Sequence, residues 1–186
     1  MKNEHGSHER RFHGGAERLR APERLALLET ATVVRLSRDG LRLSSVLDVG
    51  TGTGVFAEVF AQESLRVTGI DPNPDLLAVA RRFAPQVPFQ VAVAESLPFE
   101  DRSFDLVFLG HVLHETDDPV RALQEARRVA RKRIVILEWP YREEEKGPPL
   151  AHRLAPQRVL ELAESAGLSS IERIAMAHMD LYRASP

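Results

Sequence analysis

Short apolar segments of strand length alternate with longer helical patterns from residue 45 onward, and this alternation limits the possible folds more than any other feature. The expected strands cover residues 46–49, 66–70, 89–93, 104–109 and 134–137. The expected helices cover residues 55–63, 74–84, 119–131 and 156–166. Parallel neighbouring strands need a helical crossover, and that crossover is right-handed. The alternation therefore predicts a parallel sheet with helices packed on it.

The last two strand-like segments predict a different pairing at one edge of this sheet. Residues 170–176 and 178–183 are close enough in sequence to form a hairpin, which adds an antiparallel strand. The predicted fold class is α/β, a doubly wound and mostly parallel seven-stranded sheet with a C-terminal antiparallel hairpin strand. With 186 residues, the chain is expected to form a single globular domain.

The N-terminal segment differs in character from the rest of the chain. Its first twenty residues are densely charged and contain three His and three Gly, so we expect a mobile arm or lid. Pro22 is well placed to open a helix, and apolar residues continue that helix to Leu36. We therefore predict an N-terminal arm and helical lid over residues 1–40, followed by the main domain over residues 41–186.

Composition excludes several kinds of function. The formal net charge is −2, so we expect neither nucleic acid nor an anionic membrane as a partner. The absence of cysteine excludes disulfides, thiolate metal sites, iron–sulfur clusters and a cysteine nucleophile. The spacings of His5, His8 and His13 fit no tetrahedral metal site, and we predict no metal. Residues 1–11 lack the hydrophobic core of a secretory signal, so the expected location is cytoplasmic.

The glycine-rich run at residues 46–54, VLDVGTGTG, indicates a ligand site at the first strand–helix turn. Ligands of doubly wound folds bind beyond the carboxyl ends of the strands, and glycines let the backbone approach them closely. Asp71 follows the second expected strand, where an acidic side chain can accept hydrogen bonds from ribose hydroxyls. Asp48 would repel a pyrophosphate but could hold an ammonium group. The pattern thus favours a nucleoside with an amino-acid tail over a dinucleotide.

Several spaced motifs together resemble one family. VLDVGTGTG, VTGIDPNPDLL and AESLPFEDRSFDLVFLGHVLHE resemble the motifs of class I S-adenosylmethionine-dependent methyltransferases. The similarity covers residues 20–167 and points to the methyltransferase type 11 branch, which includes ubiquinone/menaquinone-type C-methyltransferases. The resemblance implies a Rossmann-like fold, S-adenosylmethionine as cofactor, S-adenosylhomocysteine as product and a small-molecule methyl acceptor.

The resemblance also implies which residues bind the cofactor. Asp48 and the glycine-loop backbone would contact the methionine portion, Asp71 the ribose, and Pro72 and Leu76 the adenine. The family often has an Asp where this chain has Val93, so adenine recognition would rest on Ala94, Glu95 or backbone groups. The full predicted set is Asp48, Gly50, Thr51, Gly52, Gly54, Asp71, Pro72, Leu76, Ala94, Glu95 and Leu109.

Methyl transfer from a sulfonium is an in-line displacement, so a base is needed only when the nucleophile must lose a proton. His114 is the first candidate for that base and His111 the second, because imidazole titrates near neutrality. Either histidine could instead hydrogen-bond loop backbone. The predicted acceptor-binding residues follow the fourth and fifth strands and are His111, His114, Glu115, Glu138, Trp139 and Tyr141.

Two other functions stay open at the level of sequence. The chain could be a noncatalytic S-adenosylmethionine-binding protein, which the substitution at Val93 would permit. A nicotinamide-dependent oxidoreductase shares the fold and an acidic residue after the second strand, although Asp48 and the glycine spacing argue against it. The sequence leaves the acceptor open, and it does not distinguish a monomer from a homodimer.

Overall fold

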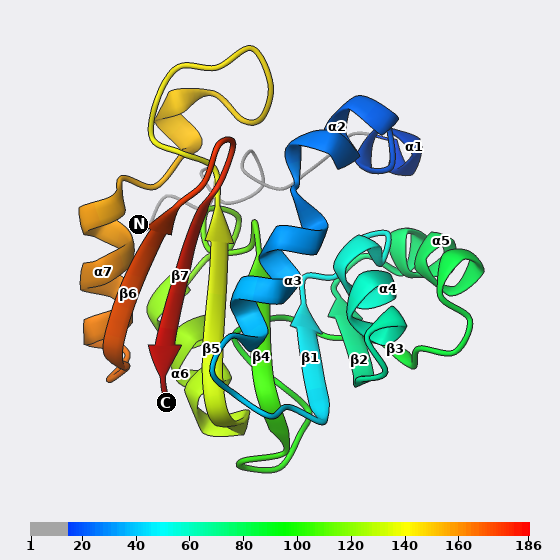
Figure 1. Cartoon of the computed structure of the whole chain (residues 1–186), viewed down its shortest axis with the longest axis horizontal. Helices are drawn as coiled ribbons and strands as arrows, with labels where there is room; N and C mark the ends of the chain where they lie inside the picture. The colour runs from blue at the N-terminus through cyan, green and yellow to red at the C-terminus, as the bar shows by residue number, and fades with distance from the viewer. Residues whose placement is uncertain (1–14) are drawn as a thin grey trace, which may run out of the picture.

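The computed structural model describes residues 15–186, and its centre is a seven-stranded sheet (Figure 1). The strand order is β3-β2-β1-β4-β5-β7-β6. Only β7 runs antiparallel to its neighbours β5 and β6, as the predicted C-terminal hairpin requires. The predicted fold class is therefore confirmed. The strands are β1 Ser45–Val49, β2 Arg66–Asp71, β3 Phe89–Val91, β4 Phe104–Gly110, β5 Ala130–Glu138, β6 Ser169–Ala175 and β7 Asp180–Ser185.

Helices cover both faces of the sheet (Figure 1). One face carries α3 (Thr30–Arg38), α4 (Val55–Gln62) and α5 (Pro74–Phe83), and the other carries α6 (Pro119–Val129) and α7 (Pro156–Ser165). Because successive side chains of a strand point to opposite faces of the sheet, each central strand contributes residues to two hydrophobic clusters. In β4, Leu106 and Phe108 pack towards α3 and α4, whereas Val107 and Leu109 pack towards α6 and α7.

The sheet changes winding direction between β1 and β4, and this fixes the position of the site. These two strands pair in parallel, with Val49 beside Leu109 at their carboxyl ends. The chain leaves β1 towards β2 on one side, whereas it leaves β4 towards β5 on the other. The loops after β1 and β4 therefore diverge and leave a crevice between them, the usual ligand position in such sheets.

The described part of the N-terminal segment, residues 15–40, is divided into more helices than the sequence predicts. His5, His8 and His13, for which we predict no metal site, lie outside the described residues. Residues 16–19 form a helical turn, α1 (Ala16–Leu19), where we expected a mobile arm. The single helix predicted from Pro22 to Leu36 is wrong, because α2 (Pro22–Leu27) ends before Glu29, whose φ of 46° is left-handed. The Glu29 carboxylate accepts a hydrogen bond from the His178 N–H, which holds this break.

Most other element boundaries differ from prediction by one or two residues, and the start of β5 differs by four. The third strand ends at Val91 rather than Val93, which forms only an isolated bridge with Ser96. Helix α6 ends at Val129 rather than residue 131, and β5 begins at the next residue. A short 3₁₀ turn (Leu150–His152) also interrupts the loop between β5 and α7.

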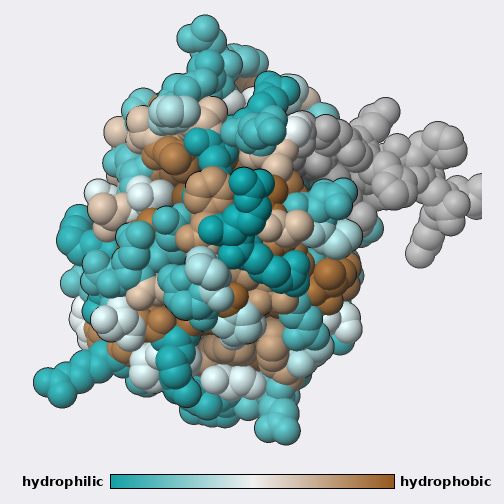
Figure 2. Space-filling model, turned by 90° about the vertical axis from the view of Figure 1, so that its right-hand side faces the viewer, coloured by the Kyte–Doolittle hydropathy of each residue, from teal (hydrophilic) through white to brown (hydrophobic). Residues whose placement is uncertain are grey.

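The surface over α5 and β3 mixes hydrophilic side chains with small apolar patches (Figure 2). The large apolar side chains most exposed in this part of the chain are Phe83, Val91 and Val93. Among residues 15–186, no helix is long and apolar enough to cross a membrane.

Helices α5 and α6 begin with side-chain caps. Asn73 accepts hydrogen bonds from the N–H groups of Asp75 and Leu76, and Asp118 accepts one from the Arg121 N–H. A proline occupies the first turn of both helices that follow these caps, where its missing N–H is not needed. The beginning of α5 lies beside the crevice.

Replacing Asp118 by alanine tests the cap of α6. The substitution leaves the Arg121 N–H without its side-chain acceptor, so the free energy of unfolding should fall by about 1 kcal/mol. Gln124→Ala is a control on an exposed position of the same helix and should change it by less than about 0.5 kcal/mol. Urea unfolding of both variants provides the comparison, and equal losses would contradict the cap.

Candidate active site

Three glycines of the loop after β1 hold left-handed backbone. The φ angles of Gly50, Gly52 and Gly54 are 64°, 54° and 77°. A Cβ at Gly50 would also lie 2.4 Å from the Val112 Cγ2 atom, so a side chain there would collide with the loop after β4. Glycine is therefore required at this position both by conformation and by space.

Asp48 is a buried carboxyl group at the base of this loop. The Thr51 hydroxyl donates a 2.6 Å hydrogen bond to Asp48 Oδ2. Burial raises the pKa of Asp48 to about 7, against the lowering effect of that hydrogen bond, and the nearby charge of Asp71 raises it further. Near neutral pH, Asp48 is therefore poised to ionise when a cation arrives beside it.

Asp71, at the end of β2, connects the glycine loop to α5. Its Oδ2 accepts the Gly52 N–H at 2.9 Å, and its Oδ1 accepts the Asn73 N–H at 2.8 Å. Burial raises the pKa of Asp71, and the two backbone hydrogen bonds partly offset that effect. Each oxygen keeps a lone pair that a ligand hydroxyl can use.

The two acidic residues line adjoining cavities. The larger cavity, of about 400 Å³, extends from Asp71 along the start of α5 and the segment after β3. The smaller, of about 100 Å³, contains Asp48 and lies between the glycine loop and α2. Five residues line both cavities, which makes them one continuous crevice. These shared residues are Gly50, Asp71, Leu76, His111 and Glu115.

His111 lies where the two cavities meet. It directly follows β4 with a φ of 61°, and its N–H donates to the Leu137 carbonyl at 2.8 Å. Its ring stacks on Trp139 with centroids 5.1 Å apart, and its Nε2 is 3.2 Å from the Met179 sulfur. Burial holds the pKa of His111 well below its usual value, helped by the positive charges of Arg24 and His114. His111 is therefore a neutral imidazole at physiological pH.

His114 occupies a different environment. Its Nδ1 is 2.7 Å from Glu138 Oε2, and its Nε2 is 3.7 Å from Glu115 Oε1. Burial lowers the pKa of His114, but the two carboxylates raise it by more, so the net shift is upward. His114 lines a separate cavity of about 270 Å³ with Asp117 and the residues before α7. Of the two candidate bases, only His111 faces the crevice.

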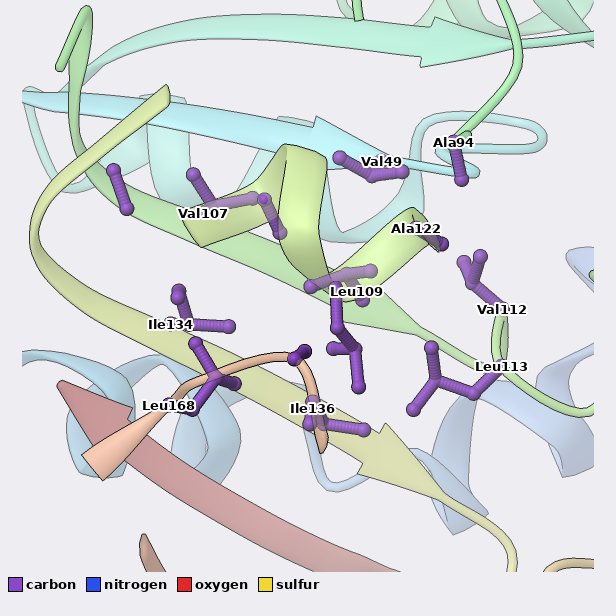
Figure 3. Packing of buried hydrophobic residues seen from close by; sticks show 14 of the residues in the cluster. Val49, Ala94, Val107, Leu109, Val112, Leu113, Ala122, Ile134, Ile136 and Leu168 are labelled. Carbon is purple, nitrogen blue, oxygen red and sulfur yellow. The ribbon is translucent and has the colours of Figure 1, made fainter. Parts of the chain in front are cut away.

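Most of the predicted cofactor residues line the crevice, and Gly54 and Leu109 are the exceptions. Gly54 is the N-cap of α4 and packs against Ala80. A Cβ atom added to Gly54 would lie 3.0 Å from the Ala80 Cβ atom. Leu109 is fully buried in the core near Leu113 and Ile136, away from both cavities (Figure 3). The nine that do line the crevice are Asp48, Gly50, Thr51, Gly52, Asp71, Pro72, Leu76, Ala94 and Glu95.

The predicted acceptor-binding residues divide in a similar way. His111 and Glu115 line the crevice. Glu138 is buried and supports the loop after β4, because it accepts the Leu113 N–H at 3.1 Å and contacts His114. Trp139 is also buried, under His111, whereas Tyr141 is half exposed, and neither lines the crevice cavities.

Two polar residues of the smaller cavity, Arg24 and Thr53, are not among the residues predicted from sequence. Thr53 lies within the glycine-rich run, so that run was the available signal. Arg24 had no local signal, because α2 reaches the crevice only through the break at Glu29. Across the described part of the chain, no three His, Asp or Glu residues come together as a metal site.

Comparisons with known proteins agree with this geometry. Residues 47–136 match the family model of a methyltransferase domain. A demethylmenaquinone methyltransferase from Chlorobaculum tepidum is 38% identical over 100 residues, 53% of this chain and 41% of that protein. The crystal structure of an S-adenosylmethionine-dependent methyltransferase from Aquifex aeolicus has a TM-score of 0.82 and 25% identity, and the match covers 91% of this chain and 95% of that one.

The chain is thus similar to S-adenosylmethionine-dependent methyltransferases in the segment 47–136 and in its fold. The matched segment runs from β1 into β5 and includes the glycine loop, Asp71 and the loop after β4. A demethylmenaquinone methyltransferase from Thermotoga maritima is also 38% identical, over 97 residues. The chain spans about two fifths of the length of these curated relatives.

The chain departs from the resembled motif at the far end of the larger cavity. Val93 lines the wall with 42% of its surface exposed, at the position where the resemblance implies a carboxylate. Glu95 also lines the cavity, but its Oε1 accepts the Asp117 N–H at 3.1 Å. The wall at this end is therefore mostly apolar, with Ala92, Val93 and Ala94 opposite Leu76.

The raised pKa of Asp48 predicts a pH-dependent stability difference. Between the unfolded pKa near 4 and the folded pKa of about 7, the folded protein binds more protons at Asp48 than the unfolded chain does. Its stability therefore falls as pH rises through this window. The side chain at position 48 does not titrate in Asp48→Asn. The free energy of unfolding of the variant minus that of wild type should therefore rise by about 2–3 kcal/mol from pH 5 to pH 8.

Urea unfolding of both proteins at the two pH values measures this difference. Titrating groups that do not interact with Asp48 behave alike in the two proteins and cancel in the comparison. A stability difference that stays constant with pH would contradict the assignment.

Proposed function

We propose that this chain is a methyltransferase that binds S-adenosylmethionine in the crevice and transfers its methyl group to a small-molecule acceptor. The observation that carries the proposal is the pair of buried acidic residues in one continuous crevice, with Asp71 where the two cavities join and Asp48 in the smaller one. A ligand that satisfies both must carry hydroxyls at one point and a cation at the other, and S-adenosylmethionine has ribose hydroxyls and an α-ammonium group.

The residues of the crevice fit this cofactor. In the larger cavity Asp71 would accept hydrogen bonds from the ribose, and Pro72, Leu76, Val93 and Ala94 would pack against adenine. In the smaller cavity Asp48 would hold the ammonium group, whose charge would lower the pKa of Asp48 and keep it ionised. The left-handed backbone of Gly50 and Gly52 leaves room for the ligand beside the loop.

When bound, the cofactor supplies a methyl group on a positively charged sulfur, which is already activated towards a nucleophile. The chain then has to align the acceptor, exclude water and receive a proton if the nucleophile carries one. His111 and Glu115 line the junction of the cavities, and His111 is neutral. If Nε2–H of His111 donates to the Met179 sulfur, Nδ1 is left as the proton acceptor.

This proposal reverses the sequence-based order of the two histidines. His111 is proposed as the base when one is used, because it lines the crevice. His114 and Glu138 are proposed to hold the loop after β4 in place, since their ion pair joins that loop to the end of β5. The helical segment over residues 15–40 is proposed as the lid of the crevice, with Leu19, Arg24 and Leu28 on its inner side.

A small-molecule acceptor of the reduced-quinone type is the first candidate. The curated relatives from Chlorobaculum tepidum and Thermotoga maritima are named demethylmenaquinone methyltransferases. Those names describe the relatives, and for this chain the acceptor class is part of the proposal.

Calorimetric titration with S-adenosylhomocysteine tests the cofactor site. Wild type should bind the ligand, and Asp71→Ala should bind it about 10- to 100-fold more weakly, because two ribose hydroxyls lose a charged acceptor. Asp75→Ala removes an exposed carboxylate of α5 as a control and should bind like wild type. NAD should not bind. Absence of S-adenosylhomocysteine binding, or tighter binding of NAD, would contradict the proposal.

A further inference from the structure

The loop between β5 and α7 is folded around one buried guanidinium group, that of Arg153. Up to its 3₁₀ turn this loop contains neither helix nor strand, and it rises above the carboxyl end of β5 (Figure 1). Arg153 Nε donates to the Pro148 carbonyl and Nη2 to the Lys146 carbonyl, both at 2.8 Å. Nη1 donates to the carbonyls of Pro140 and Arg142, both at 3.0 Å. Four backbone carbonyls therefore converge on one side chain.

The chemistry of arginine suits this role. Its planar fork of five N–H donors can satisfy several carbonyls at once, whereas a lysine ammonium has three donors on one atom. The Arg153 side chain is only 1% exposed, and Glu144 adds a carboxylate oxygen 3.6 Å from Nη1. The hydrogen bonds that a strand or helix would make within itself are made here to Arg153, so the loop conformation depends on that residue.

The loop packs directly on Trp139. A Cβ added to Gly147 would lie 2.8 Å from the Trp139 Cε3 atom, so the loop backbone touches the indole ring. The guanidinium carbon of Arg153 lies 5.6 Å from the same ring centroid. Trp139 in turn stacks with His111, with 30° between the ring planes. The loop thus reaches the imidazole at the junction of the cavities through one buried side chain.

A second route connects the loop to His111 through the turn between β6 and β7. Arg142 Nη2 donates to the Ala177 carbonyl in that turn at 2.7 Å. Two residues further on, the Met179 sulfur lies 3.2 Å from His111 Nε2. Two side chains that contact the imidazole ring, Trp139 and Met179, are therefore both tied to the loop.

We propose that Arg153 is a positioning residue, which holds His111 in its orientation at the junction of the cavities by ordering the loop after β5. Arg153 lines neither cavity of the crevice, so it acts through Trp139 and through the contact of Arg142 with Ala177. The inference rests on the proposed role of His111 as the base, and it adds a residue to which the crevice itself gives no clue.

The first test uses Trp139 as a probe, because it is the only tryptophan of the chain. Arg153→Lys keeps the positive charge but loses the fork. Loss of one guanidinium–carbonyl hydrogen bond should favour local opening of the loop about 10- to 100-fold. The emission of Trp139 should therefore shift to longer wavelength, and acrylamide should quench it more strongly than in wild type.

The second readout is the pKa of His111, from a pH titration of its side-chain NMR signals assigned with His111→Gln. Burial is the largest cause that lowers this pKa, and the charges of Arg24 and His114 add to it. When the loop opens in Arg153→Lys, water reaches the imidazole and the pKa should rise towards its usual value. A general loss of stability would lower the urea unfolding midpoint but leave the pKa of the folded protein unchanged.

Gly147→Ala is an independent perturbation that leaves Arg153 in place. Its methyl group would collide with Trp139 and push the loop away, and the φ of 91° disfavours alanine. It should shift the Trp139 emission and the pKa of His111 in the same directions, and it decides the question if Arg153→Lys does not fold. Arg158→Gln removes an exposed arginine of α7 and, as the matched control, should change neither readout.

Affinity for S-adenosylhomocysteine separates this inference from the proposed function. Arg153→Lys should bind the ligand within about threefold of wild type, because the two sites share no direct contact. Wild-type Trp139 emission and a wild-type pKa of His111 in the folded variants would overturn the positioning role, and so would loss of ligand binding in Arg153→Lys. Failure of the wild-type protein to bind the ligand would contradict the proposed function instead.

Discussion

The hydrogen bond from the Gly52 N–H to the Asp71 carboxylate is the interaction on which the crevice depends. It joins the loop after β1 to the end of β2, and the second Asp71 oxygen joins the same point to the start of α5 through Asn73. A glycine loop has little intrinsic preference for one conformation, so an external acceptor has to hold it. Asp71 supplies that acceptor from a buried position, and the shape of both cavities follows from it.

The opposite wall of the crevice is held by a second buried carboxylate, Glu138. Its two oxygens accept the Leu113 N–H and contact His114, so the end of β5 fixes the loop that follows β4. This support leaves His111 at the junction of the cavities, stacked on Trp139. Glu138 and Trp139 thus support the loop after β4 from the protein interior. His111 and Glu115 of that loop line the crevice.

The fold could be predicted from sequence because each element has a local signal. Apolar strands, the cap at Asn73 and first-turn prolines are all read within a few residues, and the parallel pairing of the central strands follows from helical crossovers. Asp48, Asp71, Gly50 and Gly52 were predicted from local spacing, and they line the crevice. Leu109 was predicted with them but lies in the core, because alternate residues of β4 point to opposite faces.

The parts that escaped prediction depend on contacts between distant segments. The break at Glu29 is held by the backbone of His178, and it turns α2 so that Arg24 reaches the crevice. The different environments of His111 and His114 arise from Met179, Trp139 and Glu138, which belong to other strands and loops. No spacing within HVLHE distinguishes the two histidines.

The most direct test of the account is a crystal structure of the protein with S-adenosylhomocysteine. The account predicts adenosine in the larger cavity, with both ribose hydroxyls within hydrogen-bond distance of Asp71, and the amino-acid end beside Asp48 in the smaller cavity. A ligand bound elsewhere, or one whose ribose makes no contact with Asp71, would contradict the central claim that this crevice is the cofactor site.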